Sequence, residues 1–178
     1  IMHLHNHPCV VAYTIFNEGW GQFESDAMYE EAKALDSNRL YDAASGWFPG
    51  KRSDFDSQHI YYKRLNLPEN PKLPILVSEA GGYSYGVPGH FYAKYTHYGY
   101  GGADSKEALT DQICSLYEKT ILPAVHKGVC GCIYTQLSDV EDETNGFYTY
   151  DRKVLKAQKE ALLKMSRRLD EAITQKGS

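Results

Sequence analysis

Short segments with the character of strands recur along the chain. Four of them are mostly apolar, contain β-branched or aromatic residues, and span 10–16, 39–44, 74–78 and 129–134. A fifth, more polar candidate spans 56–61 and ends in Ile60-Tyr61. Runs of this length and composition are typical of strands. We therefore expect five strands.

Three longer segments have apolar residues at helical spacing. The first spans about 24–35. The second begins after Asp104 or Ser105, either of which could cap it, and Pro123 interrupts it near its end. The third begins at about Arg152, with an apolar face of Leu155, Leu162, Met165, Leu169 and Ile173. Strands that alternate with helices predict an α/β fold with a parallel sheet.

Length, composition and charge indicate one globular domain. The chain has 178 residues, of which 42% are hydrophobic and 24% are charged, enough for a core of its own. The net charge of −4 gives no electrostatic reason to expect a nucleic acid or an anionic membrane. No apolar run approaches the ~20 residues that span a bilayer. We therefore expect no nucleic-acid partner, no membrane partner and no cofactor.

The four cysteines stand at 9, 114, 130 and 132, in or beside strand and helix candidates. Cys130 and Cys132 are spaced too tightly for the usual zinc-binding pairs, and nothing in the pattern requires a disulfide. We expect all four to be small buried hydrophobic residues.

Two carboxylates stand where apolar strands end. Asn17-Glu18 follows the segment 10–16, and Glu79 follows the segment 74–78. In a parallel α/β barrel the C-terminal ends of the strands carry the chemistry, so both side chains would lie at the same edge of the sheet. Most glycosidases need a pair of carboxyl groups to break a glycosidic bond. Glu18 and Glu79 are therefore the candidate catalytic residues.

Four stretches of the chain are similar to landmarks of one enzyme family. Asn6-His7-Pro8, followed by an apolar strand and Asn17-Glu18, resembles the acid/base signature of glycoside hydrolase family 2. The passage 36–46 resembles the family's entry to strand 5, 77–82 its nucleophile strand, and 131–152 its strand 8 and the start of its last helix. The landmarks occur in the family's order and cover nearly the whole chain. The family contains β-galactosidases, β-glucuronidases and β-mannosidases.

The resemblance implies a (β/α)8 barrel, of which residues 1–178 would form the C-terminal portion, about strands 4 to 8. Such a barrel takes ~250 residues and eight strands, so its first strands and the family's N-terminal β-sandwich domains would be absent. The opening Ile1-Met2-His3-Leu4 carries no secretion signal, and we expect a piece of a longer protein. An arc of five strands leaves an open edge at each end. We expect either self-association through these edges or a fold that covers them.

The resemblance assigns a retaining mechanism to the two glutamates. Glu18 would be the general acid/base, which must carry a proton when the leaving oxygen departs. Glu79 would be the nucleophile, and carboxyl groups ~5–5.5 Å apart would give retention by double displacement. The structural alternatives are a surface glutamate for Glu18 and a salt-bridged one for Glu79. Asn17 would bind the sugar 2-hydroxyl, with a turn residue that satisfies the backbone as its alternative.

The resemblance also implies a carbohydrate site with aromatic walls. Tyr61 would donate a hydrogen bond to the nucleophile, with the adjacent Tyr62 as the alternative donor. His59 would contact the sugar or be a structural histidine. Trp20 has the best claim to be a stacking platform for the pyranose ring. Trp47 and seven loop residues could also belong to this platform, and loop packing is the expected role for most of the seven, which are Tyr83, Tyr85, Phe91, Tyr92, Tyr95, Tyr98 and Tyr100.

The chain departs from the family after strand 8. The family often places a tryptophan beneath the sugar, whereas Tyr134-Thr135-Gln136 stands here, so Gln136 is the candidate for the floor of the pocket. The β-glucuronidases carry an Asn-x-Lys pair for the uronate, and the region 143–147 contains no lysine. The acidic segment 139–143, which we expect to be a solvated loop, also suits an anionic substrate badly. We therefore expect a neutral hexoside, with a β-galactoside first.

Alternative interpretations remain open. His3, His5 and His7 alternate as metal ligands on a strand do, but the resemblance places them at a helix end and a loop, so we expect no metal site. Another barrel glycosidase whose strand 4 ends in Asn-Glu is the second enzymatic interpretation. The alternative from a different class is a catalytically incomplete fragment that folds and binds sugar weakly without turnover.

Overall fold

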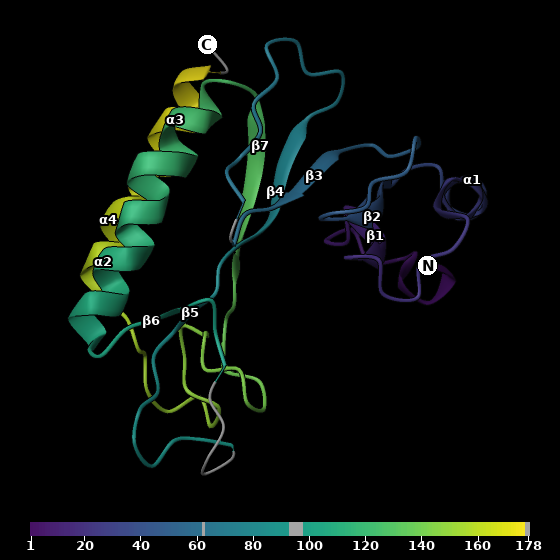
Figure 1. The fold of residues 1–178 in the computed structure, drawn as a ribbon. Coiled ribbons are helices and arrows are strands. Elements are labelled where there is room, and N and C mark those ends of the chain that lie inside the picture. Colours follow the sequence, from purple (N-terminus) through teal and green to yellow (C-terminus); the bar gives the residue numbers. More distant parts are fainter. Residues whose placement is uncertain (62, 93–97, 177–178) are drawn as a thin grey trace.

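Residues 1–61, 63–92 and 98–176 are described by the computed structural model, in which the longer strands form two separate parallel sheets (Figure 1). The larger sheet has the order β3, β4, β7, and the smaller one pairs β1 with β2. A third, two-residue pair joins β5 to β6. The strands are β1 (Ala12–Asn17), β2 (Leu40–Ser45), β3 (Asp56–His59), β4 (Ile75–Gly81), β5 (Tyr83–Ser84), β6 (Gly101–Gly102) and β7 (Val129–Thr135).

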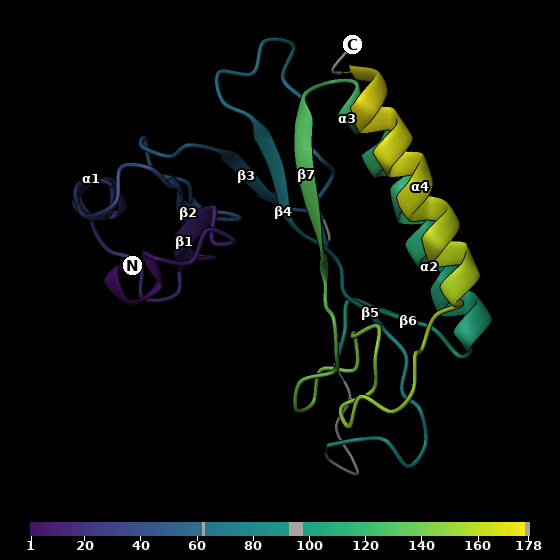
Figure 2. The same ribbon diagram turned by 180° about the vertical axis from the view of Figure 1, so that it is seen from behind.

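The helices of the C-terminal half run along one face of the larger sheet. Figures 1 and 2 show α2 and α3 in line with one another and α4 beside them, while α1 lies with β1 and β2 in a separate lobe. The helical segments are a short 3-10 turn η1 (Met2–Leu4), α1 (Ser25–Leu35), α2 (Lys106–Leu116), the π-helical turn η2 (Tyr117–Ile121), α3 (Leu122–Val125) and α4 (Lys159–Lys176).

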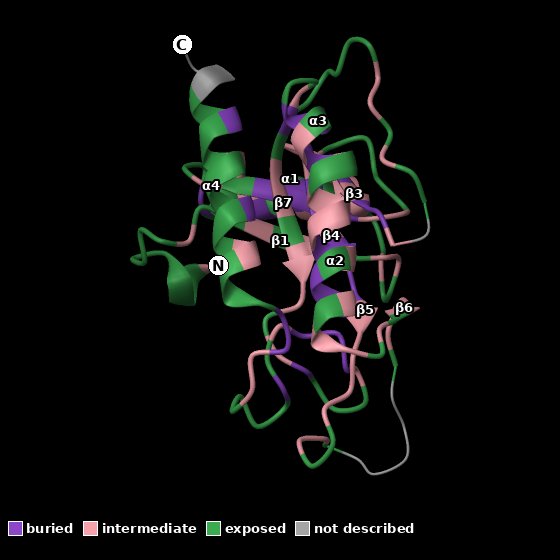
Figure 3. Cartoon of the chain, turned by 90° about the vertical axis from the view of Figure 1, so that its left-hand side faces the viewer, coloured by how far each residue is buried: buried purple, intermediate pink, exposed green. Residues whose placement is uncertain are grey.

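The core consists of separate apolar clusters that match this division. Ile75 and Val77 of β4 are completely buried against Ile121 and Ala124 of the helices. In the smaller lobe, Tyr41 of β2 packs against Tyr29 of α1. Figure 3 shows buried residues on the strands and helices and also in the loops. Of the apolar positions predicted for the last helix, Met165 is buried, whereas Ile173 is 55% exposed.

All five strands expected from the sequence are present, each within a few residues of its expected range. The five do not form one hydrogen-bonded arc, because β2 and β3 belong to different sheets. A backbone bond from Asp54 N, just before β3, to Tyr41 O of β2 and a side-chain bond from Ser45 of β2 to Ser78 of β4 join the two sheets instead. Within the described residues the sheets do not close into a barrel. Membership in a (β/α)8 barrel stays a prediction.

The expected start of the last helix at Arg152 is wrong, because α4 begins at Lys159. Arg152 has a φ of 59°, which is outside the helical region. Lys156 N donates to Phe147 O, and Leu155 forms an isolated bridge with Tyr148. These bonds hold the segment before α4 in an irregular hairpin, so Leu155 does not lie on the helix.

The expectation that all four cysteines are buried is also wrong. Cys9 and Cys130 are exposed, and Cys114 and Cys132 are partly buried. Cys9 lies in the loop before β1, and Cys130 lies on β7, which pairs on one side only within the described part of the chain. Large apolar side chains are exposed on or beside the outer strands, at Val11 and Ile133. Self-association through these edges stays a prediction.

None of the described helices is long and apolar enough to cross a membrane. The acidic loop after β7 is not fully solvated as expected, because Asp139 is buried and accepts a hydrogen bond from Lys156 Nζ at 2.6 Å. Lys156 is completely buried and also donates to Tyr85 O and Thr144 O, both at 2.8 Å. Burial lowers the pKa of Lys156, and the Asp139 carboxylate opposes that shift. The Lys156 ammonium group thus connects the segment after β5 to the loop after β7.

We predict that Lys156→Met lowers the free energy of unfolding by about 3–5 kcal/mol, because it leaves the buried Asp139 carboxylate uncompensated. Urea unfolding followed by circular dichroism measures the change. The matched control is Lys153→Met, whose side chain is 75% exposed and which should cost less than about 0.5 kcal/mol. Equal stability of Lys156→Met and the wild type would contradict the assigned role.

Candidate active site

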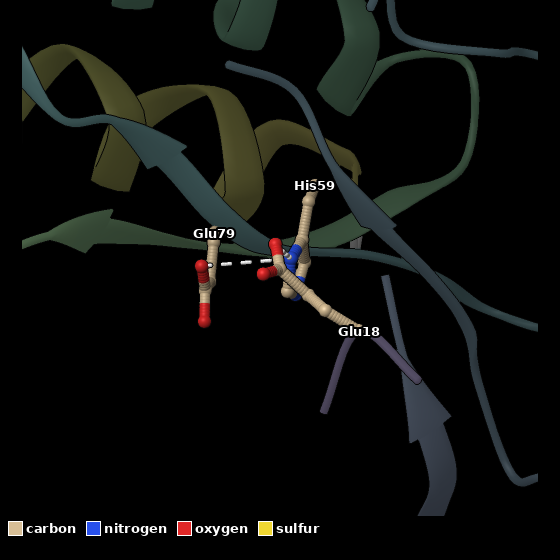
Figure 4. Close-up of side chains that lie close together, drawn as sticks. All are labelled: Glu18, His59 and Glu79. Carbon is tan, nitrogen blue, oxygen red and sulfur yellow. Dashed lines mark hydrogen bonds and ion pairs between the residues drawn. The ribbon is translucent and has the colours of Figure 1, made fainter. Parts of the chain in front are cut away.

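Three side chains from different strands meet at the C-terminal ends of β1, β3 and β4. Glu18 follows β1, His59 ends β3, and Glu79 lies near the end of β4 (Figure 4). One oxygen of each carboxylate and one ring nitrogen of His59 all lie within 4.8 Å of one another. His59 Nδ1 is 2.6 Å from Glu18 Oε1 and 3.5 Å from Glu79 Oε2. The two carboxylates expected at one edge of a sheet therefore do converge.

The backbone at this edge is shaped for close approach. Glu18 has a φ of 53°, an uncommon conformation for a residue other than glycine and one that clusters at functional sites. Gly46, which follows β2, has a φ of 92°, and a Cβ there would lie 2.8 Å from the ring of His59. A glycine at position 46 therefore lets the chain pass directly against the buried imidazole.

Serine hydroxyls surround the far side of the His59 ring. His59 Nε2 is 2.8 Å from Ser45 Oγ, and Ser45 in turn donates to Ser78 Oγ at 2.9 Å. Ser57 also donates to Ser78, at 2.6 Å, and Ser78 donates to Gln58 O. Since the single hydroxyl proton of Ser45 points to Ser78, Ser45 accepts the bond from His59, and Nε2 carries a proton.

The tautomer of His59 determines how many protons lie in the contact between His59 Nδ1 and Glu18 Oε1. With a proton on Nε2, a neutral imidazole has only a lone pair at Nδ1. The 2.6 Å contact between Nδ1 and Glu18 Oε1 therefore holds one proton, shared between the two groups. The side chain of His59 is fully buried, whereas that of Glu18 is 14% exposed. Glu18 is therefore the member of this pair that solvent can reach.

Glu79 is held from its other side by a tyrosine. Tyr61 donates to Glu79 Oε2 at 2.7 Å, and its oxygen lies 2.6 Å from Thr135 Oγ1 of β7. Burial and the negative charge of Glu79 raise the pKa of Tyr61, so its hydroxyl stays protonated and remains a donor. Tyr100 stacks on the Tyr61 ring with centroids 3.9 Å apart and planes at 9°. Tyr61, the predicted hydrogen-bond donor to Glu79, therefore contacts it, and the stacked Tyr100 ring restricts the movement of Tyr61.

The other sugar-binding candidates do not enter this cluster. Asn17 is exposed, and Trp20 is 81% exposed. The Gln136 carboxamide donates to Glu143 Oε2 and Asn145 Oδ1, both at 2.8 Å, and so takes part in a loop network. The roles expected for Asn17, Trp20 and Gln136 stay predictions.

The aromatic residues divide as the sequence analysis expected, with loop packing for most. Tyr83 and Tyr85 pack in an apolar cluster under the loop, and Tyr92 contacts Tyr150. Tyr100 is the loop residue that reaches the site. Trp47 lies edge-on to His59 with ring centroids 6.4 Å apart. Two residues of the prediction, Tyr62 and Tyr95, lie outside the described residues.

Glu18, His59 and Glu79 are also the described residues whose ligand atoms lie close enough together to hold a metal ion. His3, His5 and His7 do not form such a group within the described part of the chain. His5 instead contacts Asp36, with 3.4 Å between Nδ1 and Oδ2.

Sequence reasoning missed the partners that orient the site. Ser45 and Ser57 surround His59, and Thr135 contacts Tyr61. All three lie on strands that were expected, and Ser45 and Thr135 are the last residues of theirs. The rule that identified the two glutamates, a polar residue where a strand ends, would also have found Ser45 and Thr135.

No protein-family model matches this chain, and no curated protein matches it. The resemblance to glycoside hydrolase family 2 therefore rests on the motifs themselves, and the case for an active site rests on the geometry of Glu18, His59 and Glu79.

Asp42 of β2 is a buried carboxyl group beside this site. It is 2% exposed, and neither of its oxygens has a hydrogen-bond partner of good geometry among the described residues. Burial raises the pKa of Asp42, against the opposing effect of the nearby Ser57 and Ser45 hydroxyls. An acid whose pKa is higher in the folded state destabilises the fold progressively as pH rises through the interval between its unfolded and folded pKa values.

We predict that Asp42→Asn gains stability relative to the wild type as pH rises above about 4, the usual pKa of an aspartate. The amide carries no charge to desolvate and can donate to the serine hydroxyls. Urea unfolding of both proteins between pH 4 and pH 8 measures the difference. Asp111→Asn on the exposed face of α2 is the control and should give no such trend. A difference that is flat with pH would contradict the prediction.

Proposed function

We propose that this chain carries the catalytic residues of a retaining β-glycosidase of the glycoside hydrolase family 2 type. The observation that supports the proposal best is the approach of Glu18 and Glu79, whose nearest ligand atoms lie within 4.8 Å. Retaining glycosidases hold their carboxyl groups about 5–5.5 Å apart, whereas inverting ones need about 6.5–9.5 Å to admit a water. A closest approach of this size is compatible with the retaining arrangement and supports it.

In the first step of this mechanism, Glu79 attacks the anomeric carbon and forms a glycosyl ester, while Glu18 gives its proton to the leaving oxygen. Tyr61 orients the Glu79 carboxylate by donating a 2.7 Å hydrogen bond to its Oε2. In the second step, Glu18 takes a proton from a water molecule, the water attacks the anomeric carbon, and Glu79 departs as a carboxylate.

His59 contacts both carboxylates. Its Nδ1 shares a proton with Glu18 and lies 3.5 Å from Glu79. His59 therefore joins the proposed acid/base to the proposed nucleophile. Any change of charge on Glu79 during the reaction acts on the Glu18–His59 pair across these short distances.

The proposed substrate is a neutral hexoside, with a β-galactoside first. The charges beside the site support a neutral sugar. Glu18 and Glu79 are negative or share a proton, and Gln136 is bonded to the further acid Glu143. A uronate would meet these carboxylates, and among the described residues no lysine or arginine contacts them.

A second candidate function is a sugar-binding or inert scaffold without turnover. The exposure of Asn17 and of Trp20 favours it, because neither side chain is held against the carboxylates. On this interpretation the catalytic pair is assembled but the sugar is not positioned. The absence of turnover of every aryl β-glycoside by the folded wild-type chain would support it.

We predict that Glu79→Ala lowers the hydrolysis of aryl β-galactosides by more than about 10³-fold, the scale seen when an enzymatic nucleophile is removed. Azide should restore product formation and yield a glycosyl azide of inverted configuration. With Glu18→Ala, azide should instead give an azide of retained configuration, because Glu79 still forms the ester. Proton NMR of the anomeric centre distinguishes the products, and Glu69→Ala in an exposed loop is the control. The same configuration from both variants would contradict these roles.

We predict that Tyr61→Phe lowers kcat by about 10²–10³-fold, the scale of one lost catalytic hydrogen bond. The variant removes the donor to Glu79 and keeps the ring that stacks on Tyr100. Tyr92→Phe, at a residue 55% exposed, should leave kcat unchanged. Thermal unfolding of both variants separates a loss of stability from a loss of chemistry. Full activity of Tyr61→Phe would rule out this hydrogen bond as a contribution to the reaction.

A further inference from the structure

A cavity of about 430 Å³ lies on the helix side of the larger sheet, apart from the two carboxylates. Ile60, Leu65 and Leu67, from the end of β3 and the loop after it, line one wall, and Leu116 lines the opposite one. His59 and Tyr61, the neighbours of Ile60, contact the carboxylates instead. Successive residues of an extended chain point to opposite faces, so the cavity and the active site lie on opposite faces of this segment.

Four basic side chains surround this apolar floor: Lys63, Arg64, Lys119 and Lys127. All four are exposed, and no acidic residue is among the described residues that line the cavity. None of the four has an ion-pair partner within the described residues, but Lys63 Nζ lies 5.4 Å from the centroid of the Trp47 ring, which does not line the cavity. Glu118, the acid next to Lys119, pairs with Arg168 and lines a different cavity.

This concentration of positive charge contrasts with the chain as a whole, whose net charge is −4. Like charges gathered around one hollow repel each other, and they create a positive potential that attracts an anion. The aliphatic stems of lysine and arginine can cover apolar surface while their charged ends stay in water. The cavity therefore combines an apolar floor with basic side chains at its edge.

The wall that carries Lys119 has an unusual backbone. Lys119 and Thr120 belong to the π-helical turn η2, which precedes Pro123 and leads into α3. Single π-helical turns are rare and occur frequently at functional sites. Proline has no N–H to donate within the helix, which favours a local change of helical pitch here. This turn sets both side chains at the edge of the cavity.

We propose that this cavity is a binding site for a small amphipathic anion, with an aromatic or aliphatic body on the leucine floor and a phosphate, sulfate or carboxylate head group among the basic side chains. The volume lies within the range of about 300–1,000 Å³ that is usual for small-molecule sites. The site is distinct from Glu18 and Glu79 and does not depend on the glycosidase proposal.

The test uses 2-naphthyl phosphate as the probe and the amide NMR spectrum of the full chain as the readout. We expect saturable shifts of the amides of Leu65, Lys119 and Ala124, with a Kd on the order of 1 mM or tighter for a ligand of this size. Inorganic phosphate tests the head group alone, and 2-naphthol tests the body alone. Each should bind at least tenfold more weakly. Inorganic phosphate binding as tightly as the probe, or shifts that do not saturate, would overturn the proposal.

Charge variants test the location. Lys63→Glu combined with Lys119→Glu should weaken binding of the probe at least tenfold. The matched control combines Lys164→Glu and Arg167→Glu on the exposed side of α4, which changes the net charge equally and should keep the Kd within twofold. If the reversed charges unfold the chain, Lys63→Met with Lys119→Met keeps the stems and should show the same loss. Equal weakening by the control pair would overturn a specific site.

Discussion

The hydrogen bonds of one buried imidazole connect the two sheets and position the candidate active site. His59 is bonded at Nε2 to Ser45 of β2 and at Nδ1 to Glu18 after β1, and it is itself the last residue of β3. No strand ladder joins the two sheets within the described residues, so these side-chain bonds and those among the serine hydroxyls provide much of the polar connection between them. A buried polar group must be paired, which makes this geometry costly to change.

The proposed catalytic arrangement depends on this connection between the two sheets. Glu18 comes from the smaller lobe and Glu79 from the larger sheet, so the distance between the carboxylates is set where the two units meet. His59 fixes the position of Glu18, and Tyr61, braced by Tyr100, fixes Glu79. Each carboxylate is thereby held by a group whose own orientation is locked, as a preorganised site requires.

Much of this arrangement could be predicted from the sequence, because parallel strands end at a common edge. Glu18 and Glu79 were recognised as residues at the ends of apolar strands, and His59 and Tyr61 through the family resemblance; the structure brings all four together. The start of α4 could not be predicted, since the segment before it is held by Lys156, whose partners lie far away in sequence. Local periodicity contains no information on such long-range bonds. The exposure of Trp20, which lies in a turn after β1, could not be predicted from the local sequence either.

The central claim is that Glu79 is a nucleophile in an assembled site. The most direct measurement is covalent trapping of the folded chain with a 2-deoxy-2-fluoro-β-galactosyl fluoride, followed by mass spectrometry of the intact protein and of its peptides. We expect the mass of the chain to increase by that of one fluorosugar, located on the peptide that contains Glu79. An adduct on another residue, or no adduct on a chain shown to be folded, would contradict it.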